Sequence, residues 1–478
     1  MTSLKHSLLA LGLAFCATGC MTIHPSPTTG QVATLEVDLT TPDPASLGTP
    51  SNPVSDSQEA TFDIIARDET GAVFSGPQNV SVNVYISFGG VKTGMITACG
   101  ADAPDATPIA TVPLVNGQAL GVHVTLPQAF GPTAIWIDEP TWHAVGASPT
   151  IYFPNPRIAD VQTPVDKTAT NLTFCTAYNG KFVVVDHATG SGQLVVGSVF
   201  GDAFTITDTG VAPYDSTAQT GGFNNIYIFS FGKPPDYVEP GRLVSSFSGN
   251  ISKFVGFTEV NFPLFTLANQ ACEVATDCTG GLPCYNGLCQ INCTKDADCT
   301  SPGQHCSLGG ECLNTPPAPV VVTEADVATQ DAPHEYKLVA LSSGLVTYTG
   351  PICDPTTTRG ANSLSSWLKY SSFSMDNSGQ CDSFIDFAVG LPSKQFGTFT
   401  PVGNDMKVIT VTGMLQNGSG QNPVLDTNNQ PVTCSTTQDC LNAPSAKGTC
   451  DPLDRICKKG VYNFWTIYPR TVDDIQFQ

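Results

Sequence analysis

Short runs of alternating apolar and polar residues recur at even spacing in the first third of the chain. Alternation with a period of two is typical of a β-strand that buries one face. The runs are Leu35–Leu39, Phe62–Ile64, Val80–Tyr85, Val122–Leu126 and Thr133–Ile137. Turn-forming residues lie between them, notably Asp68-Glu69-Thr70-Gly71 and Asn116-Gly117. The pattern predicts an antiparallel β-sandwich over residues 32–158.

The order of these segments resembles a bacterial immunoglobulin-like domain. An alternating strand is followed by a D-x-x-G turn and a second strand, and later by N-G-x-A and V-x-V-x-L segments. His123 alternates with Val122 and Val124, so we expect it on the surface rather than as a metal ligand. His143 has no acidic or histidine partner nearby in the sequence, and neither histidine is assigned a role.

From residue 160 onwards, the predicted strands are longer and the loops wider. They are Lys181–Val185, Ala203–Asp208, Asn225–Phe231, Arg242–Gly249 and Pro319–Thr323. The stretches GDAFTITD, NNIYIFSF and GRLVSSFSGNISKFVGFTEVNFP resemble the OB-like barrels of exported bacterial proteins. The resemblance implies an OB-like domain over 160–326, with its fifth strand at Pro319–Thr323.

A second copy of this unit is predicted over residues 335–478. Its strands are Leu345–Gly350, Ser383–Phe387, Lys407–Leu415 and Asn463–Arg470. Val408–Leu415 and Val244–Ile251 share the pattern V-x-x-x-x-G-x-[IL], which indicates a duplication. In both copies we expect cysteine-rich insertions between the glycine-containing strand and the closing strand. The predicted fold is therefore all-β, with one sandwich followed by two barrels.

The insertions are defined by cysteines, of which the chain has 18. Twelve form three groups of four: Cys272, Cys278, Cys284 and Cys289; Cys293, Cys299, Cys306 and Cys312; Cys434, Cys440, Cys450 and Cys457. In each group five residues separate the first two cysteines, and an acid precedes the second: Asp277, Asp298 or Asp439. This internal repeat resembles the C-x5-C disulfide modules of exported Gram-negative proteins, and it occupies residues 272–312 and 434–457.

Disulfide bonds are the favoured chemistry because an even number of cysteines follows an export signal. Zinc is the weaker alternative, since the chain lacks the C-x2-C pairs usual in structural zinc sites. The pairing within each module stays open. Four further cysteines are expected to form the pairs Cys99–Cys175 and Cys353–Cys381.

The N-terminus predicts export. Lys5 and His6 precede the apolar run Leu8–Phe15, which is far shorter than the roughly 20 residues that span a bilayer. Ala17-Thr18-Gly19-Cys20 resembles a lipobox, although the family usually has an aliphatic residue such as leucine at the Ala17 position. The resemblance implies a signal peptide over 1–19 and a lipid on Cys20, and Met21 at the next position favours the outer membrane. Residues 20–31 are predicted to be a flexible tether, and an ordinary signal cleaved near this point is the alternative.

The net charge of -21 limits the possible partners. A strongly acidic chain repels phosphate backbones, so nucleic acid is a poor ligand for the OB-like barrels. Aromatic residues suited to stacking are present, but most are expected in the barrel core: Phe223, Tyr227, Phe229, Phe231, Phe254 and Phe257.

Motifs of catalysis and metal binding are incomplete. G-x-S-x-G and G-x-x-x-x-G-K-[ST] do not occur, and His334-Glu335 is followed by Leu338 where a zinc-binding H-E-x-x-H motif needs its second histidine. Asp296 and Asp298 lack the glycine and distal glutamate of a calcium loop. We therefore assign no catalytic residue, metal or cofactor.

The sequence as a whole predicts a lipid-anchored protein of the cell envelope, either periplasmic or surface-exposed. Its expected role is binding or structural, towards a protein or a carbohydrate. The alternative is an accessory or active component of an extracellular hydrolase, nuclease-like by analogy with other proteins that carry OB-like domains.

Overall fold

The computed structural model is built mainly from β-strands. Strands account for 48% of the residues and helices for 9%, which confirms the predicted all-β class. The structure describes residues 30–54, 58–76, 80–88, 91–93, 107–126, 128–165, 176–215, 217–218, 220–254, 257–269, 271–301, 303–323, 325–326, 332–350, 372–375, 387–390, 408–423, 432–435, 437–442, 449–450, 457–470 and 472–477. They fall into two compact units, the first within Met1–Gly94 and Pro108–Tyr152 and the second within Met95–Thr107 and Phe153–Gln478.

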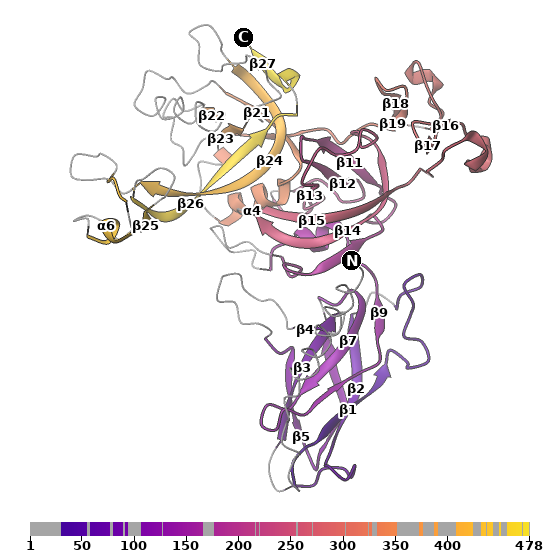
Figure 1. Cartoon of the computed structure of the whole chain (residues 1–478), viewed down its shortest axis with the longest axis vertical. Helices are drawn as coiled ribbons and strands as arrows, with labels where there is room; N and C mark the ends of the chain where they lie inside the picture. Colours follow the sequence, from indigo (N-terminus) through magenta and orange to yellow (C-terminus); the bar gives the residue numbers. More distant parts are fainter. Residues whose placement is uncertain are drawn as a thin grey trace, which may run out of the picture. The chain divides into compact units, whose positions relative to one another are not determined.

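The first unit contains two sheets (Figure 1). The smaller sheet has the order β1-β2-β6, formed by β1 (Thr34–Thr41), β2 (Glu59–Arg67) and β6 (Gln118–Thr125). The larger sheet comprises β3 (Val80–Phe88), β4 (Val91–Thr93), β5 (Ala110–Leu114), β7 (Gly131–Asp138), β8 (Val145–Ala147) and β9 (Ile151–Phe153). All five strands that alternation predicted in this region are present.

Alternate residues of these strands are buried, as a period of two requires. Phe62 and Ile64 of β2 and Val82 and Ile137 of the larger sheet are all 0% exposed. The predicted turns also form. The Asp68 carboxylate accepts hydrogen bonds from the backbone N–H groups of Thr70 and Ala72, at 2.8 and 3.1 Å. Such a side-chain bond two residues ahead is how aspartate stabilises a turn.

The second unit contains a closed five-stranded barrel. Its strands are β11 (Leu194–Val199), β12 (Ala203–Asp208), β13 (Asn225–Phe229), β14 (Leu243–Phe254) and β15 (Phe257–Leu267). The ring runs β11-β12-β13-β15-β14 and returns to β11. All neighbours in the ring are antiparallel except β13 and β15, which are parallel. Strand β10 (Phe182–Val185) pairs with β14 outside the ring, and helix α2 (Ile158–Gln162) contacts β13.

Two strands predicted for this barrel do form, but their assignment to its ring is wrong. Lys181–Val185 corresponds to β10, which lies outside the ring. The first strand of the ring is β11, and Gly197 interrupts its short apolar run. Pro319–Thr323 contains β20 (Val320–Val322), which pairs in parallel with β21 (Leu345–Thr349) of the next sheet. The barrel is closed instead by β15, which forms a hairpin with β14. The first two disulfide modules therefore follow the closing strand, and the expected insertion before that strand is wrong in this copy.

A second sheet repeats the strand order of the barrel. Its strands include β21, β22 (Ser372–Met375), β23 (Phe387–Gly390), β24 (Val408–Pro423) and β26 (Cys457–Tyr468). The order β21-β24-β26-β23-β22 matches β11-β14-β15-β13-β12, and the parallel pair β23–β26 matches β13–β15. Strand β27 (Ile475–Phe477) also pairs with β24. The third module does lie between β24 and the closing strand β26, as the sequence predicted.

The glycines of the repeated V-x-x-x-x-G-x-[IL] pattern lie where the two hairpin strands approach closely. A Cβ atom on Gly249 of β14 would lie 2.7 Å from the carbonyl oxygen of Asn261 in β15. A Cβ atom on Gly413 of β24 would lie 2.5 Å from the carbonyl oxygen of Tyr468 in β26. Any side chain at either position would collide with backbone, which explains the shared glycine.

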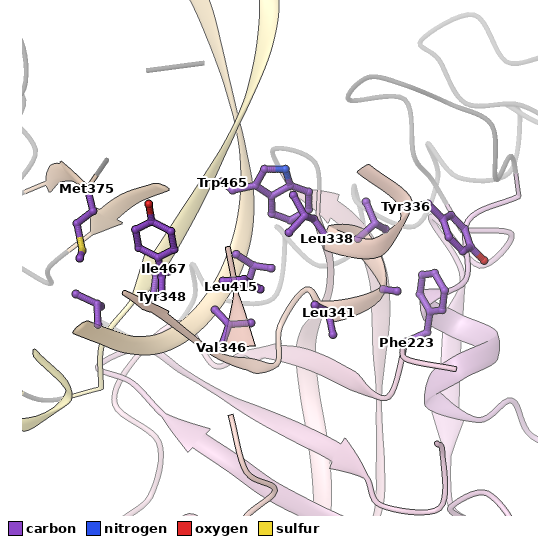
Figure 2. Packing of buried hydrophobic residues seen from close by; sticks show 14 of the residues in the cluster. Phe223, Tyr336, Leu338, Leu341, Val346, Tyr348, Met375, Leu415, Trp465 and Ile467 are labelled. Atoms are coloured by element: carbon purple, nitrogen blue, oxygen red, sulfur yellow. The ribbon is translucent and has the colours of Figure 1, made fainter. Parts of the chain in front are cut away.

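Helix α4 (Ala332–Leu341) follows β20 and precedes β21, and it packs against both the barrel and the second sheet. Figure 2 shows Tyr336 of this helix beside Phe223, which precedes β13, and Leu338 and Leu341 belong to the same cluster. The Phe223 and Tyr336 rings pack edge to face with centroids 5.2 Å apart, and the Phe223 N–H donates to the Ala340 carbonyl at 2.7 Å. The same cluster includes buried residues of β21, β24 and β26, among them Val346, Tyr348, Leu415, Trp465 and Ile467. One continuous core thus holds both copies together.

Candidate functional site

The cysteine modules contain disulfide bonds, as predicted. The pairs are Cys272–Cys284, Cys278–Cys289, Cys293–Cys306, Cys299–Cys312 and Cys440–Cys457. In the first two modules the first cysteine thus pairs with the third, and the second with the fourth. Cys434 is also disulfide-bonded.

Each module ends in a short hairpin that places its third and fourth cysteines opposite each other. The opposed pairs are Cys284 and Cys289, Cys306 and Cys312, and Cys450 and Cys457. The hairpin strands are β16 (Cys284–Tyr285), β17 (Leu288–Cys289), β18 (Gln304–Cys306), β19 (Cys312–Asn314), β25 (Thr449–Cys450) and β26, and helix α6 (Thr437–Asn442) lies in the third module.

The acid before the second cysteine has a structural role in every module. The Asp277 carboxylate accepts the N–H groups of Glu273 and Val274, and the Asp298 carboxylate accepts those of Thr294 and Lys295. The equivalent Asp439 accepts the Ser435 N–H at 2.8 Å. Backbone hydrogen bonds are the largest cause that lowers the pKa of Asp277 and of Asp298. The acid repeats because it orders the turn between the two cysteines.

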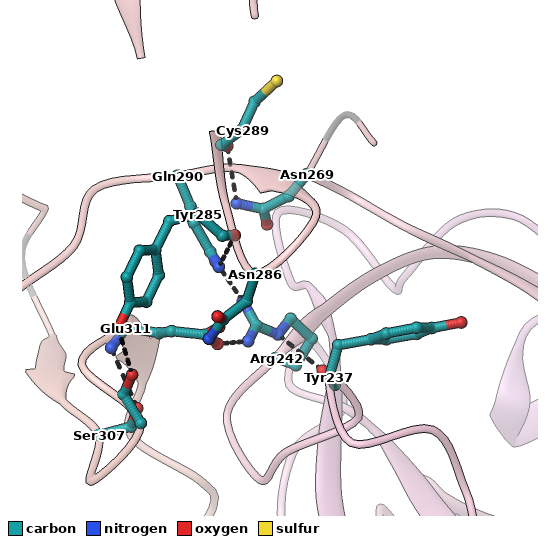
Figure 3. Close-up of polar contacts among 10 residues, drawn as sticks. Tyr237, Arg242, Asn269, Tyr285, Asn286, Cys289, Gln290, Ser307 and Glu311 are labelled. Atoms are coloured by element: carbon teal, nitrogen blue, oxygen red, sulfur yellow. Dashed lines mark hydrogen bonds and ion pairs between the residues drawn. The ribbon is translucent and has the colours of Figure 1, made fainter. Parts of the chain in front are cut away.

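The first two modules are attached to the barrel by buried polar contacts (Figure 3). Arg242, immediately before β14, forms an ion pair with Glu311 of the second module, and these side chains are 1% and 2% exposed. The Arg242 guanidinium also donates to the Gln290 side chain at 2.5 Å and to the Tyr237 carbonyl at 3.1 Å. Asn286 of the first module donates to the same Glu311 carboxylate at 2.8 Å. Barrel and modules therefore share one buried network.

The lipidation site and the two isolated cysteine pairs lie outside the described residues, and their roles stay predictions. These cysteines are Cys20, Cys99, Cys175, Cys353 and Cys381. Of the two histidines in the first unit, His123 lies on the surface, as the sequence predicts. Its Nδ1 atom lies 3.2 Å from the Thr61 hydroxyl oxygen on the neighbouring strand.

The outer face of β12 and β13 is covered within the second unit. All six residues of β12 are buried, including Ala203 and Thr205, which alternate with the inward-facing Phe204. Ala203 packs in a cluster with Tyr227 of β13 and Met414 of β24. A ligand therefore has no access to this face.

The outer face of β10, β14 and β15 is exposed and aromatic instead. Phe182, Phe262 and Leu264 are 51%, 68% and 70% exposed, and Phe231, just after β13, is 56% exposed. The Phe231 and Phe262 rings stack with centroids 4.8 Å apart and an interplanar angle of 27°. The Phe231 ring also packs against the ring of the half-buried Phe229, with centroids 4.4 Å apart. The three rings thus extend from Phe229, at the edge of the covered face, to the exposed Phe262.

Strand pairing places neutral polar side chains between these apolar ones. Ser248 lies opposite both Val184 of β10 and Leu264 of β15, Ser246 lies opposite Thr266, and Asn250 lies opposite Phe182. We call this surface the outer aromatic face; its members are Phe182, Val184, Phe231, Ser246, Ser248, Asn250, Phe262, Leu264 and Thr266. None of these side chains is ionisable, although acids outnumber bases 41 to 20 in the chain.

The two stacked rings are held on strained backbone. Phe231 has φ 59° and Phe262 has φ 53°, in the left-handed region that bulky residues rarely occupy. At Phe262 the cause is a β-bulge, because Phe262 and Pro263 together lie opposite the single residue Gly249. Strain of this kind costs about 1–3 kcal/mol per residue and is concentrated at functional sites. The strained backbone therefore makes this face a candidate functional site.

The sequence indicated this face only in part. Phe231 is one of the aromatic residues suited to stacking, most of which the sequence predicts to lie in the barrel core. Phe223 and Tyr227 are buried, but they pack against α4 and β24 outside the barrel and not in its core, and the side chains of Phe254 and Phe257 lie outside the described residues. Phe182, Phe262 and Leu264 were not singled out at all. The Phe-Pro dipeptide at 262–263 was the available signal, since proline is disfavoured inside regular strands and often marks a bulge.

A buried lysine lies beside this face in the sequence. Lys181 directly precedes Phe182 and is 7% exposed, and its Nζ atom has no hydrogen-bond partner among the described residues. Burial lowers its pKa to about 8. The amine lies 5.9 Å from the centre of the Tyr178 ring, which offers a cation–π contact. Such a lysine weakens the fold at neutral pH.

No family model, curated protein or solved structure matches this chain. Within the described ranges, none of the helices has both the length and the apolar character needed to cross a bilayer.

Proposed function

We propose that this chain is a lipid-anchored binding protein of the cell envelope, which holds a carbohydrate or a protein at the outer aromatic face. The observation that carries the proposal is the exposed stack of Phe231 and Phe262 on strained backbone. Exposed apolar surface and backbone strain are both unfavourable for folding alone. Their coincidence on one face is best explained by a ligand.

The domain identities belong to the same proposal. The first unit is an immunoglobulin-like sandwich, which its two sheets and the predicted order of turns support. The second unit consists of two OB-like barrels. Support comes from the closed ring of five strands with one parallel pair, and from the repeat of its strand order in the second sheet. In this reading the ligand does not use the strand 2–3 face typical of OB folds, because β12 and β13 are covered by the second copy.

The location follows from the N-terminus and the cysteines. Ala17-Thr18-Gly19-Cys20 provides the lipidation signal, and Met21 favours the outer membrane. Disulfide bonds in the modules suit an oxidising compartment outside the cytoplasm. If Cys20→Ser leaves the partitioning of the protein into membranes unchanged, the anchor is wrong.

The binding role can be tested without the anchor. We would purify the Cys20→Ser chain and measure its binding to isolated cell envelopes, with and without the Phe231→Ala and Phe262→Ala substitutions. Saturable binding that the double substitution removes supports the proposal. Leu120→Ala is the matched control, because Leu120 is an exposed apolar residue of the first unit at 69%. Equal binding by all forms contradicts the proposal, and hydrolysis of an envelope polymer by the purified chain would indicate an enzyme instead.

A further inference from the structure

We infer that the ligand of the outer aromatic face is a neutral glycan, a chain of uncharged sugar rings. The inference rests on the proposed binding function and names its ligand class. It starts from ring geometry: Phe262 stacks on Phe231 at 4.8 Å and still leaves 68% of its own surface exposed. The face of a phenyl ring is electron-rich. The C–H groups on one side of a pyranose ring carry partial positive charge and therefore stack on it.

The polar side chains of the face suit sugar hydroxyl groups. Ser246, Ser248, Asn250 and Thr266 lie on β14 and β15 among the apolar residues. Hydroxyl and amide groups both donate and accept hydrogen bonds, as sugar hydroxyls do. An aromatic platform with such groups beside it satisfies both the apolar and the polar sides of a sugar ring.

The members of the face carry no ionisable side chain, and the acid that follows on the same side of the sheet, Glu259 opposite Ser252, is only 5% exposed, so the face favours a neutral ligand. A nucleic acid or an anionic glycan needs Lys or Arg to offset its charge. A cationic polymer would be attracted to acids, and acids are common elsewhere in this chain but absent from these positions. Protein interfaces are enriched in arginine as well as aromatics. The composition of the face therefore fits uncharged sugars better than any of these.

The geometry also suits an extended chain. Val184 and Leu264 flank Ser248 across three paired strands, Phe182 lies opposite Asn250, and Phe262 lies on the β15 bulge opposite Gly249. Apolar side chains thus occur at successive places along an open sheet surface. A polysaccharide laid across it can stack one ring on Phe262 and rest others on Leu264 and Phe182.

The test uses the full Cys20→Ser chain and soluble probes. We would titrate neutral hexasaccharides of glucose, mannose, galactose and N-acetylglucosamine, with oligogalacturonate and dextran sulfate as charged probes, and measure binding by calorimetry. We expect saturable binding of at least one neutral probe, with an affinity that does not change with salt. Phe262→Ala is expected to weaken it at least about tenfold, and Asn250→Asp, which changes charge but hardly size, at least severalfold.

Two further variants separate binding from folding. Phe262→Gly removes the ring and also the steric cost of the left-handed backbone at this position. Loss of binding in a stable Phe262→Gly chain therefore supports the inference. Leu308→Ala alters a fully exposed leucine in the second module and is expected to leave affinity unchanged.

Failure of the inference can be told apart from failure of the proposed function. If Phe262→Ala abolishes binding to envelopes but no neutral probe binds or competes, the face binds a ligand that is not a neutral glycan. Tight binding of the charged probes alone overturns the inference too. Concentration-dependent dimerisation that Phe262→Ala abolishes would assign the face to a second copy of this chain and overturn both proposals.

Discussion

Arg242, immediately before β14, and Glu311 in the second disulfide module form an ion pair that is almost completely buried. The pair joins the barrel to a module that is too small to bury a core of its own. A backbone hydrogen bond also connects the barrel and the module at this junction. The Asn314 N–H donates to the Gly241 carbonyl at 3.1 Å. The modules are therefore a fixed part of the second unit.

Breaking this ion pair is expected to loosen the modules. Glu311→Gln leaves the guanidinium of Arg242 buried without its counter-ion, which typically costs about 3–5 kcal/mol. The combined change Arg242→Met with Glu311→Leu is expected to cost less than either single change, because no charge is left unpaired. Native-state hydrogen exchange at the Asn314 amide measures the free energy of this opening.

The control is a surface ion pair. Arg67 and Glu36 lie 2.7 Å apart on the first unit, with both side chains substantially exposed. Arg67→Met is expected to have little effect, since solvent screens such pairs. An equal effect of Glu311→Gln and Arg67→Met would show that the buried pair does not hold the module.

Phe262→Gly is expected to stabilise the protein relative to Phe262→Ala. Both variants remove the stacked ring, but only glycine adopts φ 53° without a steric cost. The difference in unfolding free energy should be about 1–2 kcal/mol, measured by denaturant titration. If Phe262→Ala is the more stable variant, the backbone at this bulge is not strained.

Lys181→Met is expected to stabilise the protein at pH 7. The pKa of Lys181 is about 8 in the folded chain and 10.5 is its ordinary value, a difference that corresponds to about 3 kcal/mol. Below pH 8 the folded state must keep a buried charge, so the full penalty applies. Between pH 8 and 10.5 the unfolded chain binds more protons than the folded chain, and the free energy of unfolding rises with pH. Lys181→Met should remove the part of this rise that comes from Lys181.

Denaturation midpoints at pH 7 and pH 10 provide the measurement. Lys233→Met is the control, because its side chain is 75% exposed. Burial also lowers the pKa of Lys253 to about 8, so the part of the rise that comes from Lys253 should persist in the Lys181→Met chain. A Lys181→Met protein that is less stable at pH 7 would mean that the amine makes a favourable ionic contact.

Cys434 is expected to pair with Cys450. The first two modules pair their first cysteine with the third, and Cys440–Cys457 follows the same second-to-fourth rule. Cys450 also lies opposite Cys457 in a hairpin, as the third and fourth cysteines do in the other modules. Peptide mapping without reduction tests this pair, together with Cys99–Cys175 and Cys353–Cys381. Any other partner for Cys434 would break the equivalence of the modules.

Local pattern was enough to predict the longer strands of the first unit and many of those of the second, but not the short strands β4, β5, β8 and β9. It failed where pairing depends on distant residues. The closing strand β15 is held by a parallel contact with β13, which no local pattern encodes. Strand β11 was missed because Gly197 interrupts its apolar run.

The outer aromatic face was missed for a related reason. Val260 and Phe262 are two residues apart and should share one face of β15. Val260 is 0% exposed and Phe262 is 68% exposed, because the bulge at Phe262 reverses the alternation. A bulge is a property of two paired strands, and the sequence of one strand does not reveal it. The module acids, by contrast, were visible as a repeat, although their hydrogen bonds were not.

The central claim is that the outer aromatic face is the binding surface. The most direct test is fluorine NMR of the Cys20→Ser chain labelled with fluorophenylalanine, titrated with the neutral hexasaccharides. Signals of Phe231 and Phe262 can be assigned from their alanine variants. The account predicts that these two signals shift with a bound probe while that of the buried Phe62 stays in place. Unchanged Phe231 and Phe262 signals across all the neutral probes, or shifts confined to other phenylalanines, would contradict it.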